Sequence, residues 1–395
     1  MEVLKIIIVF LIIISLMRFK WPIGCAILIG SLFLGLFSGL SFVHISKIAI
    51  LSTIDKVTLE LATALLLIGI FSKLLEESGS LEEIVTSLRG LIQDSRIILA
   101  GLPALIGLMP MIGGAVFSAP LVEEVSKPLE LSSEKKAFIN YLFRHPFEYI
   151  WPLYPGIILA AKLTNIELQR LIILQVPLAL GLLLMGTILG LTDIRIEKSH
   201  QKTSFLVLRR LILNLFPFLL VFALTLGLRI PLVISLCLGI VPIFFINRID
   251  LKEGMRVILK GFSYEVVVLV IGIMVFKGIL ERSSAILNIT SLLSQYRVPS
   301  LLMIIVCPFL VGLVSGVSVS YVGTCFPMLI PLFKGEGEVV LAFASGYAGV
   351  LLSPVHVCLV LTEEYFKADM KKIYSRLLLP VFVTLLIGFV IFLVL

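Results

Sequence analysis

Residues 107–120 read Gly-Leu-Met-Pro-Met-Ile-Gly-Gly-Ala-Val-Phe-Ser-Ala-Pro, and residues 312–327 read Gly-Leu-Val-Ser-Gly-Val-Ser-Val-Ser-Tyr-Val-Gly-Thr-Cys-Phe-Pro. Both are apolar segments interrupted by glycine, serine and proline, and they occupy matching places in the two halves of the chain. Paired interrupted segments of this kind are typical of membrane proteins built from inverted repeats, where they indicate a binding site for a transported solute.

The composition of the chain predicts an all-α polytopic membrane protein. Of its 395 residues, 59% are hydrophobic and only 14% are charged, whereas about 25% are charged in an average soluble domain. The apolar residues form blocks of about 15–25 residues, long enough to cross a hydrocarbon core of about 30 Å as helices. The chain is therefore expected to contact a lipid bilayer. About ten transmembrane helices are expected, over residues 3–17, 22–41, 58–75, 138–161, 171–192, 207–228, 231–247, 264–280, 339–361 and 377–395.

Neither the net charge nor the cysteines indicate another class of partner. The formal net charge is +7, but the cations lie in short loops between apolar blocks. Retention of these loops on the cytoplasmic side of a membrane explains them without a nucleic acid. The five cysteines lie inside apolar blocks without metal-type spacing. Disulfides, a bound metal and an organic cofactor are therefore not expected.

Two further apolar segments, 97–122 and 299–333, can each either cross the membrane or turn back as a re-entrant hairpin. If both turn back, 21 Lys and Arg residues lie on one side and 10 on the other, leaving Arg144 aside; if both cross, the division is 15 to 16. Because cytoplasmic loops carry an excess of Lys and Arg, the first arrangement is preferred. It predicts two re-entrant hairpins in a prokaryotic cytoplasmic membrane, with both chain termini outside.

The two halves are expected to be related by duplication. Residues 1–192 and 207–395 each contain five spans and one hairpin, and 193–206 form a cytoplasmic linker. Trp151-Pro152-Leu153-Tyr154 parallels Ser353-Pro354-Val355-His356 at an offset of 202 positions. An odd number of spans per half requires the second copy to be inverted relative to the first. The alternative is that apolar sequences resemble one another by composition alone.

The strings at 143–152, Phe-Arg-His-Pro-Phe-Glu-Tyr-Ile-Trp-Pro, and at 352–362, Leu-Ser-Pro-Val-His-Val-Cys-Leu-Val-Leu-Thr, resemble a prokaryotic integral-membrane family called domain of unknown function 401. The resemblance covers almost the whole chain. That family is grouped with the ion transporter superfamily of gluconate, citrate, dicarboxylate and arsenite carriers. The resemblance implies a scaffold, a moving transport domain, a homodimer and elevator-type motion. The Ser-Asn-Thr tips of the sodium-coupled dicarboxylate carriers are missing here.

The hairpin tips are the expected substrate site, because a backbone turn inside a bilayer must line a cavity or be buried in protein. Glycines allow close backbone approach, hydroxyls offer hydrogen bonds, and helix N-termini attract an anion. The alternative is that these small residues only let helices pack closely. The expected substrate-binding residues here are Gly113, Gly114, Ser118, Ser315, Gly316, Ser318, Ser320 and Thr324.

Arg144 and Glu148 lie in an otherwise apolar block beside Pro146, where a broken helix is expected. Charged side chains at bilayer depth usually face a partner or a functional cavity. Arg144 is therefore a second kind of substrate-binding candidate, able to bind a carboxylate or phosphate in a bidentate manner, and Glu148 is a candidate for ion coupling. The alternative for Arg144 is a side chain that extends to the cytoplasmic interface.

His356 occupies the matching block of the second half, after Ser353-Pro354. Its ring is able to titrate near neutral pH, which suits proton coupling. The alternative is a neutral histidine that only makes hydrogen bonds in the core.

These residues predict a secondary active transporter, not an enzyme, for a small anionic solute driven by H⁺ or Na⁺. Other possibilities are an intramembrane hydrolase built from Ser318 and His356, a flippase for a lipid-linked substrate, and a channel. No zincin motif, paired intramembrane aspartates or Gly-x-Ser-x-Gly supports an enzyme.

Overall fold

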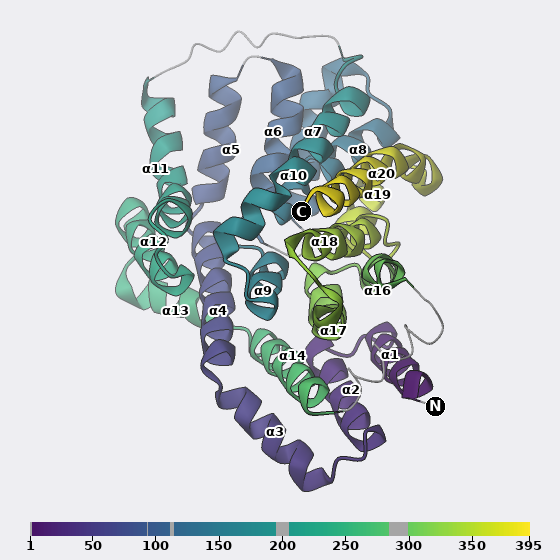
Figure 1. Ribbon diagram of the computed structural model, residues 1–395. Coiled ribbons are helices and arrows are strands. Elements are labelled where there is room, and N and C mark those ends of the chain that lie inside the picture. The colour runs from purple at the N-terminus through teal and green to yellow at the C-terminus, as the bar shows by residue number, and fades with distance from the viewer. Residues whose placement is uncertain (1, 93, 111–113, 195–204, 284–298) are drawn as a thin grey trace.

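The fold of the chain is helical throughout the part that can be described. The computed structural model describes residues 2–92, 94–110, 114–194, 205–283 and 299–395, and all regular structure in these ranges is helix (Figure 1). The expected all-α class is therefore confirmed for them.

The described residues of the first half form ten α-helices, more than the five spans and one hairpin that the apolar blocks predict. The broken block around Pro146 holds an additional 3₁₀ helix, η2 (Pro146–Tyr149), and η1 (Lys127–Leu129) follows α7. The α-helices are α1 (Glu2–Arg18), α2 (Ile23–Phe37), α3 (Phe42–Ile54), α4 (Lys56–Glu77), α5 (Ser80–Leu91), α6 (Ser95–Gly107), α7 (Ala115–Ser126), α8 (Ser133–Leu142), α9 (Pro155–Thr164) and α10 (Leu168–Gly190).

The second half repeats this order among its described residues. A π-helical turn, η3 (Ala223–Gly227), continues α11, and a 3₁₀ turn, η4 (Ile330–Leu332), follows α17. The α-helices are α11 (Phe205–Phe222), α12 (Leu232–Asn247), α13 (Leu251–Gly261), α14 (Tyr264–Arg282), α16 (Ser300–Ser315), α17 (Ser318–Leu329), α18 (Glu336–Leu351), α19 (Val357–Phe366) and α20 (Met370–Val394).

Four described helices are long and apolar enough to cross a membrane: α4, α10, α11 extended to Gly227, and α20. The pair α13 and α14, bent by 42°, is a fifth candidate. The blocks at 138–161 and 339–361, expected as single spans, are divided, the first into α8, η2 and α9 and the second into α18 and α19. Prolines at 146, 152 and 354 explain the breaks, because proline lacks a backbone N–H and disfavours helix in the residue before it.

The long helices leave apolar stripes uncovered on the outside of the chain. On α20, Leu378, Phe382, Leu386 and Val390 follow one another at four-residue spacing and are each at least half exposed. Four residues is close to one helical turn, so these side chains share one face. Together with the long apolar helices, such uncovered faces are consistent with a membrane protein.

The helices form three groups that draw on both halves. Helices α1, α2 and α3 gather with α14 of the second half, at the bottom of Figure 1, while α11, α12 and α13 gather beside α4 of the first half, at the left. Thus the second and third helices of each half pack on the fourth helix of the other half, while α1 packs on α2 and α11 packs on α12 and α5. The third group contains both interrupted segments and both broken blocks, with α10 and α20 side by side.

Candidate functional site

Each interrupted segment forms two helices that pack against one another and meet at a break. Helix α6 ends at Gly107 and α7 begins at Ala115, while α16 ends at Ser315 and α17 begins at Ser318. At the second break Gly316 has φ of +67°, a left-handed conformation that favours glycine. Gly113 lies outside the described residues. These breaks lie close to the expected hairpin tips.

The broken block of each half bonds the interrupted segment of the same half. The Tyr154 hydroxyl donates to the carbonyl oxygen of Gly107 at 2.5 Å. His356, 202 positions later, has Nδ1 2.6 Å from the carbonyl oxygen of Gly316. In both halves, therefore, a carbonyl oxygen at the end of the first helix of the interrupted segment is hydrogen-bonded by a side chain from the broken block.

The same two units approach one another closely at their backbones. A β-carbon added at Gly107 would lie 2.2 Å from the carbonyl oxygen of Arg144. One added at Gly312 would lie 2.1 Å from the carbonyl oxygen of Gly346, which is again 202 positions after Arg144. Only glycine permits this contact, which holds the first helix of each interrupted segment against the broken block of the same half.

Histidines from the two halves meet between these breaks. Nε2 of His145 lies 3.0 Å from Nε2 of His356. The other ring nitrogen of His145, Nδ1, lies 2.5 Å from the carbonyl oxygen of Tyr141. Cys358 completes a buried cluster with the two histidines, in which the potential metal-ligand atoms lie within 4.8 Å of one another. This cluster, His145, His356 and Cys358, is the group of described residues that could hold a metal ion.

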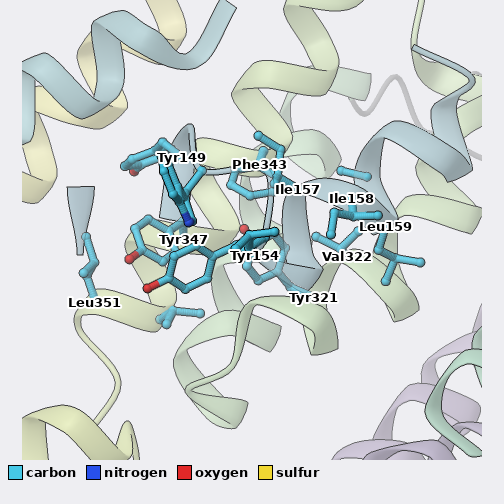
Figure 2. Packing of buried hydrophobic residues seen from close by; sticks show 14 of the residues in the cluster. Tyr149, Tyr154, Ile157, Ile158, Leu159, Tyr321, Val322, Phe343, Tyr347 and Leu351 are labelled. Carbon is cyan, nitrogen blue, oxygen red and sulfur yellow. The ribbon is translucent and has the colours of Figure 1, made fainter. Parts of the chain in front are cut away.

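Tyrosine hydroxyls hydrogen-bond the backbone next to this cluster. The Tyr347 hydroxyl donates to the carbonyl oxygen of His145, and the Tyr141 hydroxyl to that of Leu351, both at 2.9 Å. Tyr347 packs edge-to-face on Tyr149, with ring centroids 4.7 Å apart. Figure 2 shows this aromatic packing, with Tyr154 beside the same group. The two halves are thus joined by hydrogen bonds at the cluster itself.

Arg144 lies inside the protein rather than at its surface. Its side chain is 3% exposed. A β-carbon added at Gly114, the residue before α7, would lie 2.2 Å from a guanidinium nitrogen of Arg144. The guanidinium therefore rests against the N-terminal end of α7, where the helix dipole is also positive.

Glu148 is half-buried in the first broken block and faces residues of both halves. Its hydrogen-bonding and charged neighbours are Ser318, Tyr347, His356 and Arg144. Ser318 is the first residue of α17, and a β-carbon at Gly156 of α9 would lie 2.9 Å from its hydroxyl oxygen. The structure thus gathers Gly114, Arg144, Glu148, Gly316, Ser318 and His356 around the two breaks.

Most of the remaining residues expected to bind substrate make hydrogen bonds to backbone groups of their own helix or turn. Thr324 bonds the carbonyl of Ser320 at 2.6 Å, and Ser118 bonds carbonyls of its own helix. Ser315 bonds within its own turn. Ser320 is fully buried. The hydroxyls of Thr324, Ser118 and Ser315 therefore bond α17, α7 and the turn between α16 and α17, whereas the Ser320 hydroxyl has no hydrogen-bond partner among the described residues.

Sequence reasoning missed three members of the site: Tyr141, Tyr347 and Cys358. His145 and Tyr154 were noted only as neighbours of other candidates. The offset of 202 could have found one of the missed residues, because it relates His145 to Tyr347 just as it relates Tyr154 to His356. Cys358 was dismissed with the other cysteines, although it follows His356 by two positions.

The chain belongs to the family described as Protein of unknown function (DUF401), which it matches over residues 2–395. The resemblance noted in the sequence is confirmed at the level of this family. No curated protein shows significant similarity to the chain.

Proposed function

We propose that the chain is a secondary active transporter of a small anionic solute. It acts in a prokaryotic cytoplasmic membrane, by elevator-type alternating access coupled to H⁺ or Na⁺. The single observation that carries this proposal is the meeting of two interrupted helix pairs and two broken blocks at one buried group of ionisable residues.

The charges at this place favour an anion. Arg144 rests against the start of α7, and Ser318 begins α17. Both helices present unpaired N–H groups and the positive end of their dipole to the same region. A guanidinium beside a helix N-terminus is a recurrent way to bind a carboxylate or phosphate. Glu148, which faces Ser318 and Arg144, is the group proposed to bind the coupling cation.

The matching contacts of the two halves support an inverted repeat. The bonds of Tyr154 and His356, and the close approaches of Gly107 and Gly312, join corresponding units at corresponding positions. Inverted repeats with interrupted helices at their interface are the recurring architecture of carriers that alternate between two access states. The same architecture underlies the proposed placement in the ion transporter superfamily and the proposed homodimer.

An intramembrane hydrolase built from Ser318 and His356 has less support. A general base must lie within hydrogen-bond reach of the nucleophile. Both ring nitrogens of His356 face other groups, the carbonyl of Gly316 and Nε2 of His145. In this arrangement neither nitrogen is aimed at the Ser318 hydroxyl.

Uptake by the reconstituted chain tests the proposal. Proteoliposomes under an imposed proton or sodium gradient are screened with radiolabelled carboxylates, phosphate, sulfate and arsenite. We expect one of these anions to accumulate, Arg144→Gln to reduce its uptake at least tenfold, and Glu148→Gln to abolish the response to the gradient. Arg96→Gln is the matched control, because Arg96 pairs with Asp94 at the far end of α6.

Two results would refute the proposal. One is that no anion accumulates under either gradient. The other is that an anion accumulates equally well with Arg144→Gln and Arg96→Gln, which would place the solute elsewhere. Hydrolysis of a substrate in the absence of any gradient would instead favour the enzyme.

A further inference from the structure

We propose that His145, His356 and Cys358 bind a transition-metal ion of the zinc type at the junction of the two halves. All three side chains are buried, with exposed fractions of 1%, 8% and 7%. Their potential ligand atoms lie within 4.8 Å of one another. Two imidazoles and one thiolate form a ligand set that suits Zn²⁺ and related ions.

The hydrogen bonds of the two rings fix which nitrogens are free to bind. Nδ1 of His145 faces the carbonyl oxygen of Tyr141 and Nδ1 of His356 that of Gly316. A carbonyl oxygen only accepts, so each Nδ1 must carry the proton that it donates. Each neutral ring then presents the lone pair of Nε2.

These two lone pairs point at one another across 3.0 Å. Two acceptors repel one another at this distance, and a positive species between them removes the repulsion. Histidines that bind metals almost always donate their second ring N–H to a carboxylate, a backbone carbonyl or water. Both histidines of the cluster show that arrangement.

The dimensions of the cluster suit such an ion after a small adjustment. Zinc binds imidazole nitrogen at about 2.0–2.1 Å in tetrahedral geometry, which places two ligand nitrogens about 3.3 Å apart. The Nε2 atoms at 3.0 Å need to separate by only a few tenths of an ångström. The sulfur of Cys358 belongs to the same cluster, and its thiolate supplies the negative charge that a metal needs in a buried site.

The charged side chains near the cluster do not oppose a bound cation. Glu148 and Arg144 are the charged groups that act on His356, and their charges offset each other. A divalent ion with the Cys358 thiolate then leaves one positive charge. A proton shared by the two rings, with a neutral thiol, leaves the same charge, so a shared proton is the competing occupant. The cysteine distinguishes them, because only a metal needs its thiolate.

Metal binding by the solubilised full-length chain tests this inference. The purified protein is stripped with a chelator and titrated with Co²⁺ and then Zn²⁺, following the charge-transfer absorption of a Co²⁺–thiolate bond and the thermal unfolding midpoint. We expect one Co²⁺ per chain, displacement by Zn²⁺, and a higher midpoint, because a ligand that binds only the folded state stabilises it.

Two variants locate the site. Cys358→Ser is expected to abolish the thiolate absorption and to weaken Co²⁺ binding at least tenfold. Cys325→Ser, a change at a fully buried cysteine in α17, is the matched control and should bind as the unmodified chain does. His356→Gln should also weaken binding, and its circular dichroism reports whether it still folds.

Three results would overturn the inference. They are a folded unmodified chain that binds no Co²⁺, thiolate absorption that persists in Cys358→Ser, and a midpoint that responds to pH but not to metal. The last would assign a shared proton to the histidine pair. None of these measurements uses a gradient or a solute, so they succeed or fail independently of the proposed transport.

Discussion

At the scale of single residues, two glycines determine how closely the helices of the site approach one another. Gly107 and Gly312 place the backbone of one helix against a carbonyl of a broken block, Arg144 in one half and Gly346 in the other. Rigid backbone, rather than a flexible side chain, lies where a β-carbon would be. A methyl group there must move two elements of the site apart.

Alanine substitutions at these glycines test the close approach. Gly107→Ala and Gly312→Ala are each expected to lower the free energy of unfolding by about 1–3 kcal/mol, as overpacking does. The thermal unfolding midpoint in detergent measures the effect. Gly101→Ala is the control in α6, because no described atom lies within 4 Å of its β-carbon position.

Alanine is the better helix former, so the control should be neutral or slightly stabilising. Equal midpoints for Gly101→Ala and Gly107→Ala would mean that α6 does not pack on Arg144 as described.

The residue types of the site were only partly predictable. Arg144, Glu148 and His356 stand out because ionisable residues are rare in apolar blocks. Nothing in the sequence shows that His145 faces His356, because 211 positions separate them. Likewise, whether a serine bonds its own helix or a neighbour depends on its rotamer, so Thr324 and Ser118 looked as promising as Ser318.

At the scale of elements, the position of the breaks was predictable and their consequences were not. Glycine and proline mark both interrupted segments, expected at 97–122 and 299–333 and found as α6 with α7 and α16 with α17. Helix α5 was not expected, because its twelve residues are less apolar than a span. The blocks at 138–161 and 339–361 have enough apolar residues for a span, yet proline divides them.

An ion pair joins α8 to the residues that follow α10, outside the long apolar segments. Lys135, near the start of α8, pairs with Asp193, which follows α10. The hydrogen bond from Lys135 lowers the pKa of Asp193 below its ordinary value of 3.8. A carboxyl whose pKa is lowered by folding stabilises the folded state above its unfolded pKa, and that stabilisation is lost as the pH falls through the folded value.

Asp193→Asn is therefore expected to destabilise the chain at pH 7, with an effect that begins to decline only as the pH falls below about 3.8, the ordinary value for this group. The Asp193 side chain is 72% exposed, so the loss should not exceed about 1 kcal/mol, as for surface ion pairs. Unfolding midpoints of both proteins between pH 7 and pH 3.5 measure it.

In a Lys135→Gln background the same substitution should have a smaller effect, because Lys135 is the main cause of the lowered pKa. A difference that grows as the pH falls would contradict the pairing.

At the scale of the whole molecule, the packing of the halves around one another is the main result. Helices α2 and α3 pack on α14 of the second half, and α12 and α13 pack on α4 of the first half. Composition predicts the helical class and the uncovered apolar stripes, because both follow from average properties of long segments. Which half covers which helix depends on contacts between distant segments, and one sequence does not reveal them.

Orientation in the membrane is a prediction at this scale. The excess of Lys and Arg places Lys127, after α7, in the cytoplasm and Lys334, after α17, outside. Both are exposed. In a cysteine-free background, a membrane-impermeant maleimide applied to intact cells should label Lys334→Cys and not Lys127→Cys. Permeabilised cells should allow labelling of both.

Labelling of both positions in intact cells, or of neither, would contradict the proposed inverted arrangement of the two halves.

The hydrogen bonds of the site have a consequence for the order of events during synthesis. Tyr141 bonds Leu351, His145 meets His356 and Asn140 bonds Thr362, across 210, 211 and 222 positions of the chain. At about 5–20 residues per second, a ribosome needs about 10–40 s to make the second partner after the first. Throughout that interval the nascent first half carries Arg144 and His145 without the groups that later surround them. The inserting chain therefore depends on water, lipid head groups or the insertion machinery to shelter these side chains until α19 arrives.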